Sequence, residues 1–64
     1  MNEPLFAIGD IVKMSLCYTK AVIAEVIPKP LGEYTYRIRY ITSSQISAYT
    51  WDEKQLQLFQ KGNT

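Results

Sequence analysis

Histidine is absent from this sequence, and cysteine occurs once, at Cys17. Without histidine the chain cannot build a Ser-His-Asp triad, a Cys-His pair or a histidine metal site, and it lacks the usual proton shuttle near neutral pH. A single thiol forms no internal disulfide, and its ordinary role is that of a small apolar side chain. These absences point to a protein that is not an enzyme and that uses no metal and no cofactor.

Membrane-length apolar runs and a strong net charge are also missing. Hydrophobic residues make up 47% of the chain and charged residues 20%, which indicates a soluble globular protein. Seven basic residues stand against six acidic ones, so only a local cluster of cations can attract nucleic acid, and we expect no association with membranes. Met1 is followed by polar residues and Pro4 instead of a signal segment, which predicts a cytoplasmic protein.

The length of 64 residues predicts one small domain over residues 1–64, with residues 1–5 and 60–64 frayed. The clearest pattern is an alternation in residues 33–41 with the period of two that is typical of a β-strand on a core. One face carries Tyr34, Tyr36, Ile38 and Tyr40, and the other carries Thr35, Arg37 and Arg39. We expect Tyr36 and Tyr40 to enter the core with Phe6, because a domain this small must bury some of its rings.

Further strands are predicted on both sides of this one. Gly9-Asp10 is a turn signal before a strand at residues 11–16, and a short connection leads to a second strand at 21–27. The inward face of the second strand is predicted to be Val22, Ala24 and Val26, with Ile23, Glu25 and Ile27 outward. The opposite phase stays open, although it would bury Glu25.

Residues 28–32 contain two prolines and Gly32 and predict a hairpin loop. A fourth strand is predicted at 46–51, then a helical turn at 52–55 capped by Asp52, and a closing strand at 56–59. The fold class is therefore all-β, a five-stranded small barrel with one short helical turn before the last strand.

The order of these features resembles the Src-homology-3-like small barrels, which include Tudor and KOW modules. The likeness is carried by residues 6–12, 24–26, 36–40 and 51–56. Small bacterial proteins of unknown function share the Gly-Asp-x-Val start and the Tyr-Arg-x-Arg-aromatic strand. The resemblance implies the fold, and such barrels bind peptides, methylated lysines, nucleic acids or one another.

The type II dihydrofolate reductase, a tetramer of small barrels, is superficially similar. That family has a Lys shortly after its Gly-Asp-x-Val start, and Lys13 stands there in this chain. Its Gln-Ile-Tyr signature is missing, because Gln45-Ile46 is followed by Ser47. This enzyme is therefore a remote alternative.

Two groups of side chains are candidate binding residues. Arg37 and Arg39 project from one face of their strand, where they can meet phosphates or carboxylates, unless Glu25 on the neighbouring strand neutralises them. Rings near loop ends either form an aromatic binding site or pack against the core; they are Tyr18, Tyr34, Tyr49 and Trp51.

A third group is a candidate interface of outward isoleucines, Ile11, Ile23 and Ile27. Exposed β-branched side chains beside a sheet edge favour partner docking or a homo-oligomer. If the second strand has the other phase, these side chains belong to the core. The leading hypothesis is a non-catalytic module that binds a protein partner or assembles with itself, and the alternative is a nucleic-acid-binding module that uses Arg37 and Arg39 with aromatic stacking.

Overall fold

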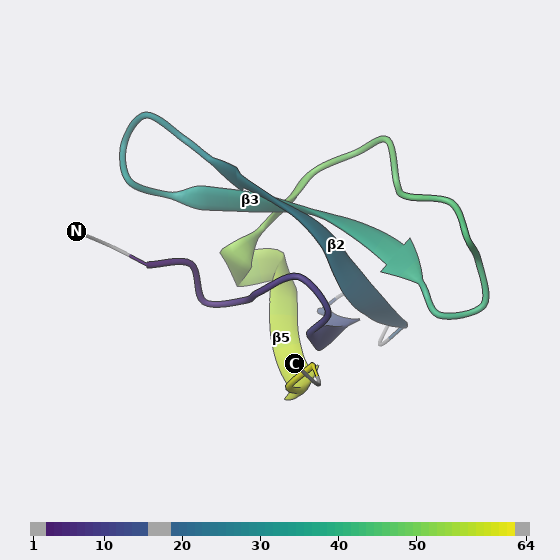
Figure 1. The fold of residues 1–64 in the computed structure, drawn as a ribbon. Helices are drawn as coiled ribbons and strands as arrows, with labels where there is room; N and C mark the ends of the chain where they lie inside the picture. Colours follow the sequence, from purple (N-terminus) through teal and green to yellow (C-terminus); the bar gives the residue numbers. More distant parts are fainter. Residues whose placement is uncertain (1–2, 16–18, 63–64) are drawn as a thin grey trace.

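The computed structural model describes residues 3–15 and 19–62, which form one antiparallel sheet of five strands in the order β4-β3-β2-β1-β5 (Figure 1). A 3-10 turn, η1, precedes the last strand. The bounds are β1 (Ile11–Met14), β2 (Lys20–Pro28), β3 (Tyr34–Tyr40), β4 (Trp51–Asp52), η1 (Glu53–Gln55) and β5 (Leu56–Gln60). The predicted all-β class and the helical turn before the closing strand are confirmed.

The β2–β3 hairpin is closed by the predicted proline-rich loop. The Lys29 N–H donates to the Glu33 carbonyl at 2.8 Å, and Gly32 takes a φ of 81°. A positive φ is accessible to glycine because it has no Cβ. β2 and β3 are the longest strands of the sheet, with nine and seven residues, and they carry Glu25, Arg37 and Arg39.

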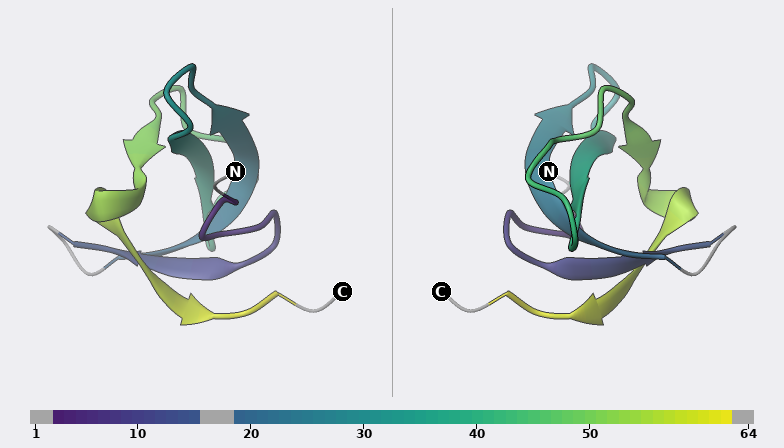
Figure 2. Two further views of the ribbon diagram at one scale, coloured as in Figure 1. Left: turned by 90° about the vertical axis from the view of Figure 1, so that its left-hand side faces the viewer. Right: turned by 90° about the vertical axis from the view of Figure 1, so that its right-hand side faces the viewer.

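The sheet curls around a common interior, and η1 carries the chain from the edge strand β4 to the opposite edge strand β5 (Figure 2). The side chain of Gln55 accepts the Asp52 N–H at 2.9 Å, which holds the start of the turn. The Ser15 N–H donates to the Gln55 carbonyl at 2.9 Å and ties the end of the turn to the segment after β1. Closure of the curled sheet into a barrel stays a prediction.

The predicted phase of β2 is wrong in its first half. Ile23 is 0% exposed and lies in the core, whereas Glu25 stays exposed. A bulge explains both, because Ile23 pairs with Ile38 and Glu25 pairs with Arg37, so Ala24 is the extra residue between them. An extra residue reverses the alternation, and Ile23 and Val26 therefore both face the core.

The core is built from the concave side of the sheet. Its buried side chains are Phe6, Val12, Met14, Ala21, Ile23, Tyr36, Ile38 and Leu56. The rings of Phe6 and Tyr36 meet edge to face with their centroids 5.2 Å apart, as expected for these two residues. The prediction for Tyr40 is wrong, because this ring is at the end of β3 and is 39% exposed.

The predicted strand at 46–51 is also wrong over most of its length. Ile46 makes an isolated bridge with Arg39, and ladder pairing with β3 begins only at Trp51. Between them, the hydroxyl of Ser47 accepts the Tyr49 N–H at 3.1 Å. Such local side-chain bonds compete with strand pairing, so the segment forms an irregular connection.

The C-terminal segment is held to the turn before β1. Asp10 is 3% exposed, and its carboxylate accepts the Gly62 N–H at 2.9 Å and the Ala7 N–H at 2.9 Å. The Lys61 ammonium lies 3.7 Å from the same carboxylate. Of the end that is predicted to be frayed, Gln60 belongs to β5 and the Gly62 N–H bonds to Asp10, while residues 63 and 64 lie outside the described chain.

Candidate functional site

Arg37 and Arg39, the two predicted binding arginines, have different partners. The Arg37 Nε lies 3.5 Å from the Glu25 carboxylate, the residue that faces it across β2 and β3. Arg39 donates instead to the Ser43 carbonyl at 3.0 Å. Glu25 therefore neutralises one of the two arginines, and the other keeps its charge beside a neutral group.

Two lysines share one aromatic ring on the convex side of the sheet. The Lys13 ammonium lies 5.0 Å from the Phe59 ring centroid and the Lys20 ammonium lies 4.0 Å from it. Lys13 and Lys20 face each other directly across β1 and β2. Within residues 3–15 and 19–62, no carboxylate forms an ion pair with Lys13, Lys20 or Arg39.

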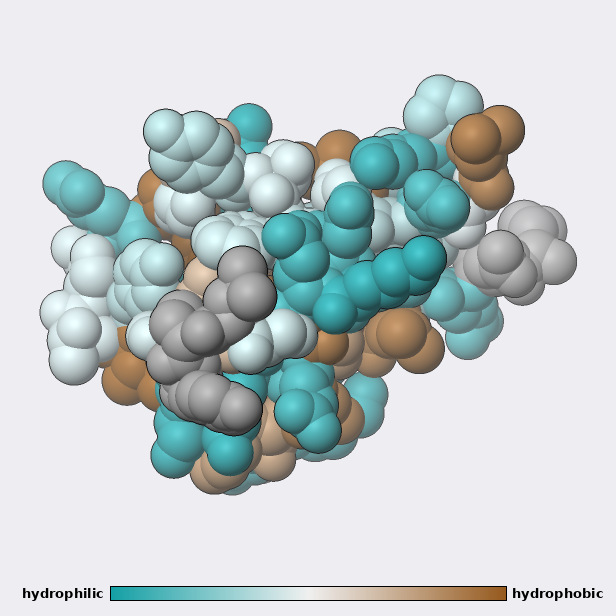
Figure 3. Space-filling view, turned by 180° about the vertical axis from the view of Figure 1, so that it is seen from behind, coloured by the Kyte–Doolittle hydropathy of each residue, from teal (hydrophilic) through white to brown (hydrophobic). Residues whose placement is uncertain are grey.

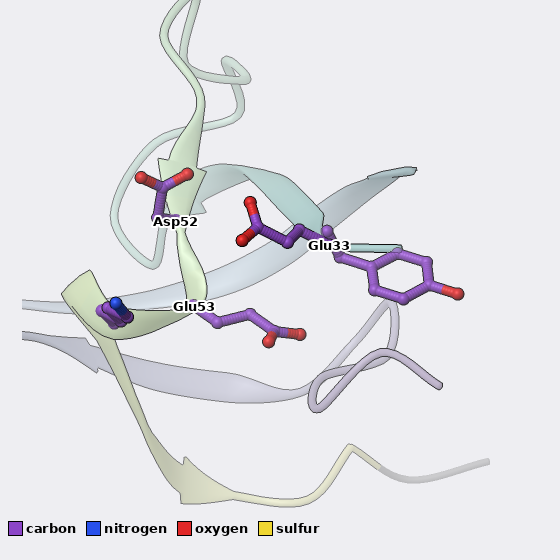
Figure 4. A pocket seen from close by; sticks show the side chains of 5 residues that line it. Glu33, Asp52 and Glu53 are labelled. Atoms are coloured by element: carbon purple, nitrogen blue, oxygen red, sulfur yellow. The ribbon is translucent and has the colours of Figure 1, made fainter. Parts of the chain in front are cut away.

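Acidic side chains collect around an open pocket of about 150 Å³ lined by Glu33, Tyr34, Asp52, Glu53 and Lys54. Figure 4 shows that the labelled carboxylates point in different directions around this pocket. Asp52 is 3.4 Å from the Lys29 ammonium. Among the described residues there is no group of three His, Cys, Asp or Glu side chains that could hold a metal ion.

Glu53 has a structural task in this pocket. Its carboxylate accepts the Tyr36 hydroxyl at 2.5 Å and the Leu5 N–H at 3.1 Å. Burial of the ring and the hydrogen bond to Glu53 raise the pKa of Tyr36 to about 12, so this phenol is neutral under physiological conditions. The pair joins β3, η1 and the segment before β1.

The predicted aromatic residues do not share one environment. Tyr34 and Trp51 are half-buried and pack against the core, whereas Tyr49 is 78% exposed. Tyr18 lies outside the described residues. Two of the three described rings therefore contribute to packing, and Tyr49 presents its ring to solvent.

The predicted interface of three isoleucines does not form, because Ile23 is in the core. Ile11 and Ile27 are half-buried and face different partners, Val22 and Thr35. Figure 3 shows the face behind the view of Figure 1, where hydrophobic side chains occur in separate groups around a hydrophilic middle.

The sequence alone does not bring Lys13 and Lys20 together with an aromatic ring. The missing information is the register of β1 against β2 and β5, which brings both lysines to Phe59. The short polar connection between the two strands indicates that β1 pairs with β2. The contact of the lysines with Phe59 joins residues far apart in the sequence, and no local pattern predicts it.

The chain was compared with protein-family models, with curated proteins and with solved structures, and none of the three comparisons yields a match. The resemblance to Src-homology-3-like barrels therefore stays a prediction. In the described segments, helical structure amounts to a single 3-10 turn, and no helix has the length and apolar character needed to cross a bilayer.

Proposed function

We propose that this protein is a non-catalytic interaction module that assembles with a second copy of itself through the edge of β5. The observation that carries this proposal is the character of that edge. β5 has the sequence Leu-Gln-Leu-Phe-Gln, without charge or proline over its five residues, and it ends the strand order of the sheet. Edge strands usually carry lysine, proline or inward charges that discourage pairing.

The direction of the backbone groups supports pairing at this edge. Hydrogen bonding alternates along an antiparallel strand, and Ser15 bonds to Gln55 at the start of the β1–β5 contact. Counting from that bond, Gln57 turns its N–H and C=O toward Lys13, its partner on β1. Leu58 therefore turns its N–H and C=O toward the open edge.

The residues of β5 are also self-complementary. An antiparallel pair of β5 strands centred on Leu58 lets the two copies of this residue exchange N–H···O=C bonds. The Leu58 side chain is 41% exposed, so its counterpart in the second copy covers apolar surface. With no charge in the strand, no like charges meet across the twofold axis.

The opposite edge lacks these properties. β4 is two residues long, and its Asp52 carries a charge that pairs with Lys29. Short, charged edges resist pairing. Of the two edges of the sheet, β5 is the one that supports assembly.

The non-catalytic part of the proposal rests on the side chains that usually perform acid–base chemistry. The chain has no histidine, and Asp10, Glu25, Asp52 and Glu53 are each committed to a structural partner. The remote reductase alternative predicts NADPH-dependent turnover of dihydrofolate, and we expect a blank assay.

Charge substitutions at Leu58 test the self-pairing. We expect light scattering to show a concentration-dependent dimer for the unmodified protein, and monomers for Leu58→Lys and for Leu58→Glu, because each places like charges opposite one another. Mixing the two variants should restore a dimer. Leu58→Ala keeps the edge N–H and serves as the control that still dimerises.

A monomer at every concentration overturns the proposed assembly, as does a mixture of the two charged variants that stays monomeric. Dimers that persist in both charged variants place the contact elsewhere and also overturn it. We expect each variant to retain the sheet, because the Leu58 N–H lies outside the β1–β5 ladder, and circular dichroism checks this.

A further inference from the structure

Lys13 and Lys20 place two like charges opposite one another across β1 and β2. The Met14 N–H donates to the Thr19 carbonyl at 3.1 Å, which makes Met14 and Thr19 a hydrogen-bonded pair. The adjacent pair, Lys13 and Lys20, is then the non-hydrogen-bonded one, in which facing side chains approach most closely. Like charges at such positions destabilise a sheet.

No described carboxylate relieves this repulsion, although the chain has acidic residues to spare. Glu25 occupies the same side of β2 but pairs with Arg37, while Asp10, Asp52 and Glu53 have partners elsewhere. A like-charge pair that no carboxylate offsets breaks a local rule of folding, and such positions are candidates for function. The two ammonium groups are instead arranged around a ring.

A third cation extends the cluster along the same face. Arg39 faces Val22, which is two residues from Lys20, so Arg39 and Lys20 are diagonal neighbours at about 7–8 Å. One guanidinium nitrogen donates to Ser43, and the group has further donors in its planar fork. Lys13, Lys20 and Arg39 thus form a row of positive charge in a protein whose net charge is only +1.

Phe59 adds an aromatic surface to this row. Its ring is 44% exposed and projects beside the two lysines from the edge strand β5. Cations that follow a phosphate backbone beside a ring on which bases stack are the two elements of single-strand recognition. A duplex offers no unstacked base to the ring, and an acidic peptide has no base at all.

We propose that the convex face formed by Lys13, Lys20, Arg39 and Phe59 is a binding site for single-stranded nucleic acid. The lysines and the arginine contact phosphates, and Phe59 stacks on a base. Binding replaces the repulsion between Lys13 and Lys20 by attraction of both to the bound phosphates. The site uses the convex face of the sheet and leaves the backbone edge of β5 open, so it is independent of the proposed self-pairing.

The first test measures binding of a fluorescent single-stranded oligonucleotide at several salt concentrations by anisotropy. We expect affinity to fall with salt, and Lys13→Gln to reduce the slope of log affinity against log salt by about 0.7, the value for one lost phosphate contact on a single strand. Lys54→Gln removes the same charge from η1, outside the row of Lys13, Lys20 and Arg39, and should leave the slope unchanged. Phe59→Leu should weaken binding by about tenfold through lost stacking.

The second test separates binding from folding with Lys20→Glu. This variant places a carboxylate opposite Lys13 and replaces the like-charge pair by an ion pair, so we expect a higher thermal unfolding midpoint together with loss of oligonucleotide binding. Retained binding in Lys20→Glu overturns the proposal. Equal effects of Lys13→Gln and Lys54→Gln overturn it too, and so does full competition by an acidic peptide of the same charge as the oligonucleotide.

Discussion

The hydrogen bond between Tyr36 and Glu53 determines how the largest buried side chain is accommodated. Tyr36 is 0% exposed, and a buried phenol needs a partner for its hydroxyl. The partner is the Glu53 carboxylate, which also accepts the Leu5 N–H. One acidic residue on η1 therefore satisfies two groups from separate parts of the chain.

We predict that Tyr36→Phe lowers the free energy of unfolding by about 2 kcal/mol near neutral pH, since a hydrogen bond to a charged group is lost. The pKa of Tyr36 is raised to about 12 from the ordinary 10 by burial and by Glu53. The unfolded phenol then loses its proton first, so the contribution is complete below pH 10 and disappears as the pH rises through 12.

Denaturant unfolding of the two proteins at several pH values measures this difference. The gap between the unmodified protein and Tyr36→Phe should narrow across that alkaline window. Tyr49→Phe is the matched control, because Tyr49 is 78% exposed and should leave stability unchanged. A constant gap at alkaline pH contradicts the assigned role of Tyr36.

Asp10 is the acidic counterpart. Burial alone would raise its pKa, but the N–H groups of Gly62 and Ala7 and the Lys61 ammonium lower it below the ordinary value of 3.8. A carboxyl with a lowered pKa stabilises the fold above its unfolded pKa, and this contribution is lost as the pH falls through the folded pKa.

Asp10→Asn is therefore expected to lower the free energy of unfolding by about 1–3 kcal/mol near neutral pH. The difference from the unmodified protein should shrink below pH 3.8. Urea unfolding across acidic pH checks both statements. Glu33→Gln removes an acidic group that lines the pocket and should not reproduce this pH dependence.

At the scale of the strands, the predicted interface treats Ile11 on β1 and Ile23 on β2 alike, but the phase of β2 places Ile23 in the core. Ile23→Ala should cost about 2–5 kcal/mol, because it opens a cavity in the core. Ile11→Ala should cost clearly less, because Ile11 is half-buried. A domain of this size has only about 3–5 kcal/mol of net stability, so we expect Ile23→Ala to be largely unfolded by circular dichroism while Ile11→Ala stays folded. Equal losses would contradict the observed phase.

Local sequence patterns predicted where the strands lie better than they predicted which side chains of each strand face the core. The alternation of β3 and the proline-rich hairpin are visible in the sequence and are confirmed. An alternation of apolar residues contains no sign of the extra residue Ala24, because Val22, Ile23 and Val26 are all apolar. The β-branched and aromatic residues at 46–51 suggested a strand, but the hydroxyl of Ser47 bonds within the segment.

At the scale of the whole molecule, the C-terminal segment meets the turn before β1 at Asp10. A Cβ on Gly62 would lie 2.5 Å from the Gly9 carbonyl oxygen, and this atom belongs to the backbone, which has little room to move. Gly62→Ala should therefore separate the C-terminal segment from the turn and lower the thermal unfolding midpoint. Combined with Asp10→Asn, it should add little, because both changes break the same contact. Additive losses would show that the contact is not shared.

Long-range contacts set the limit of prediction from this sequence. Gly9-Asp10 indicated a turn, but Asp10 and Gly62 are 52 positions apart, so the sequence does not reveal that the same carboxylate holds the C-terminal segment. The candidate site also depends on a long-range contact, since Lys13 and Lys20 are near each other in sequence but Phe59 is far from both. The sequence shows that cationic and aromatic residues are present, but only the pairing of β1 with β5 brings them together in one site.

The bulge at Ala24 implies that the bend of β2 is encoded by the number of residues in the strand. If Ala24 were deleted, the remaining order would alternate without interruption, with Ala21, Ile23 and Val26 inward and Val22, Glu25 and Ile27 outward. Every one of these side chains would keep its present face, and the strand would lose its bend. Substitutions at this position are therefore expected to be tolerated in evolution, whereas a single-codon deletion is not.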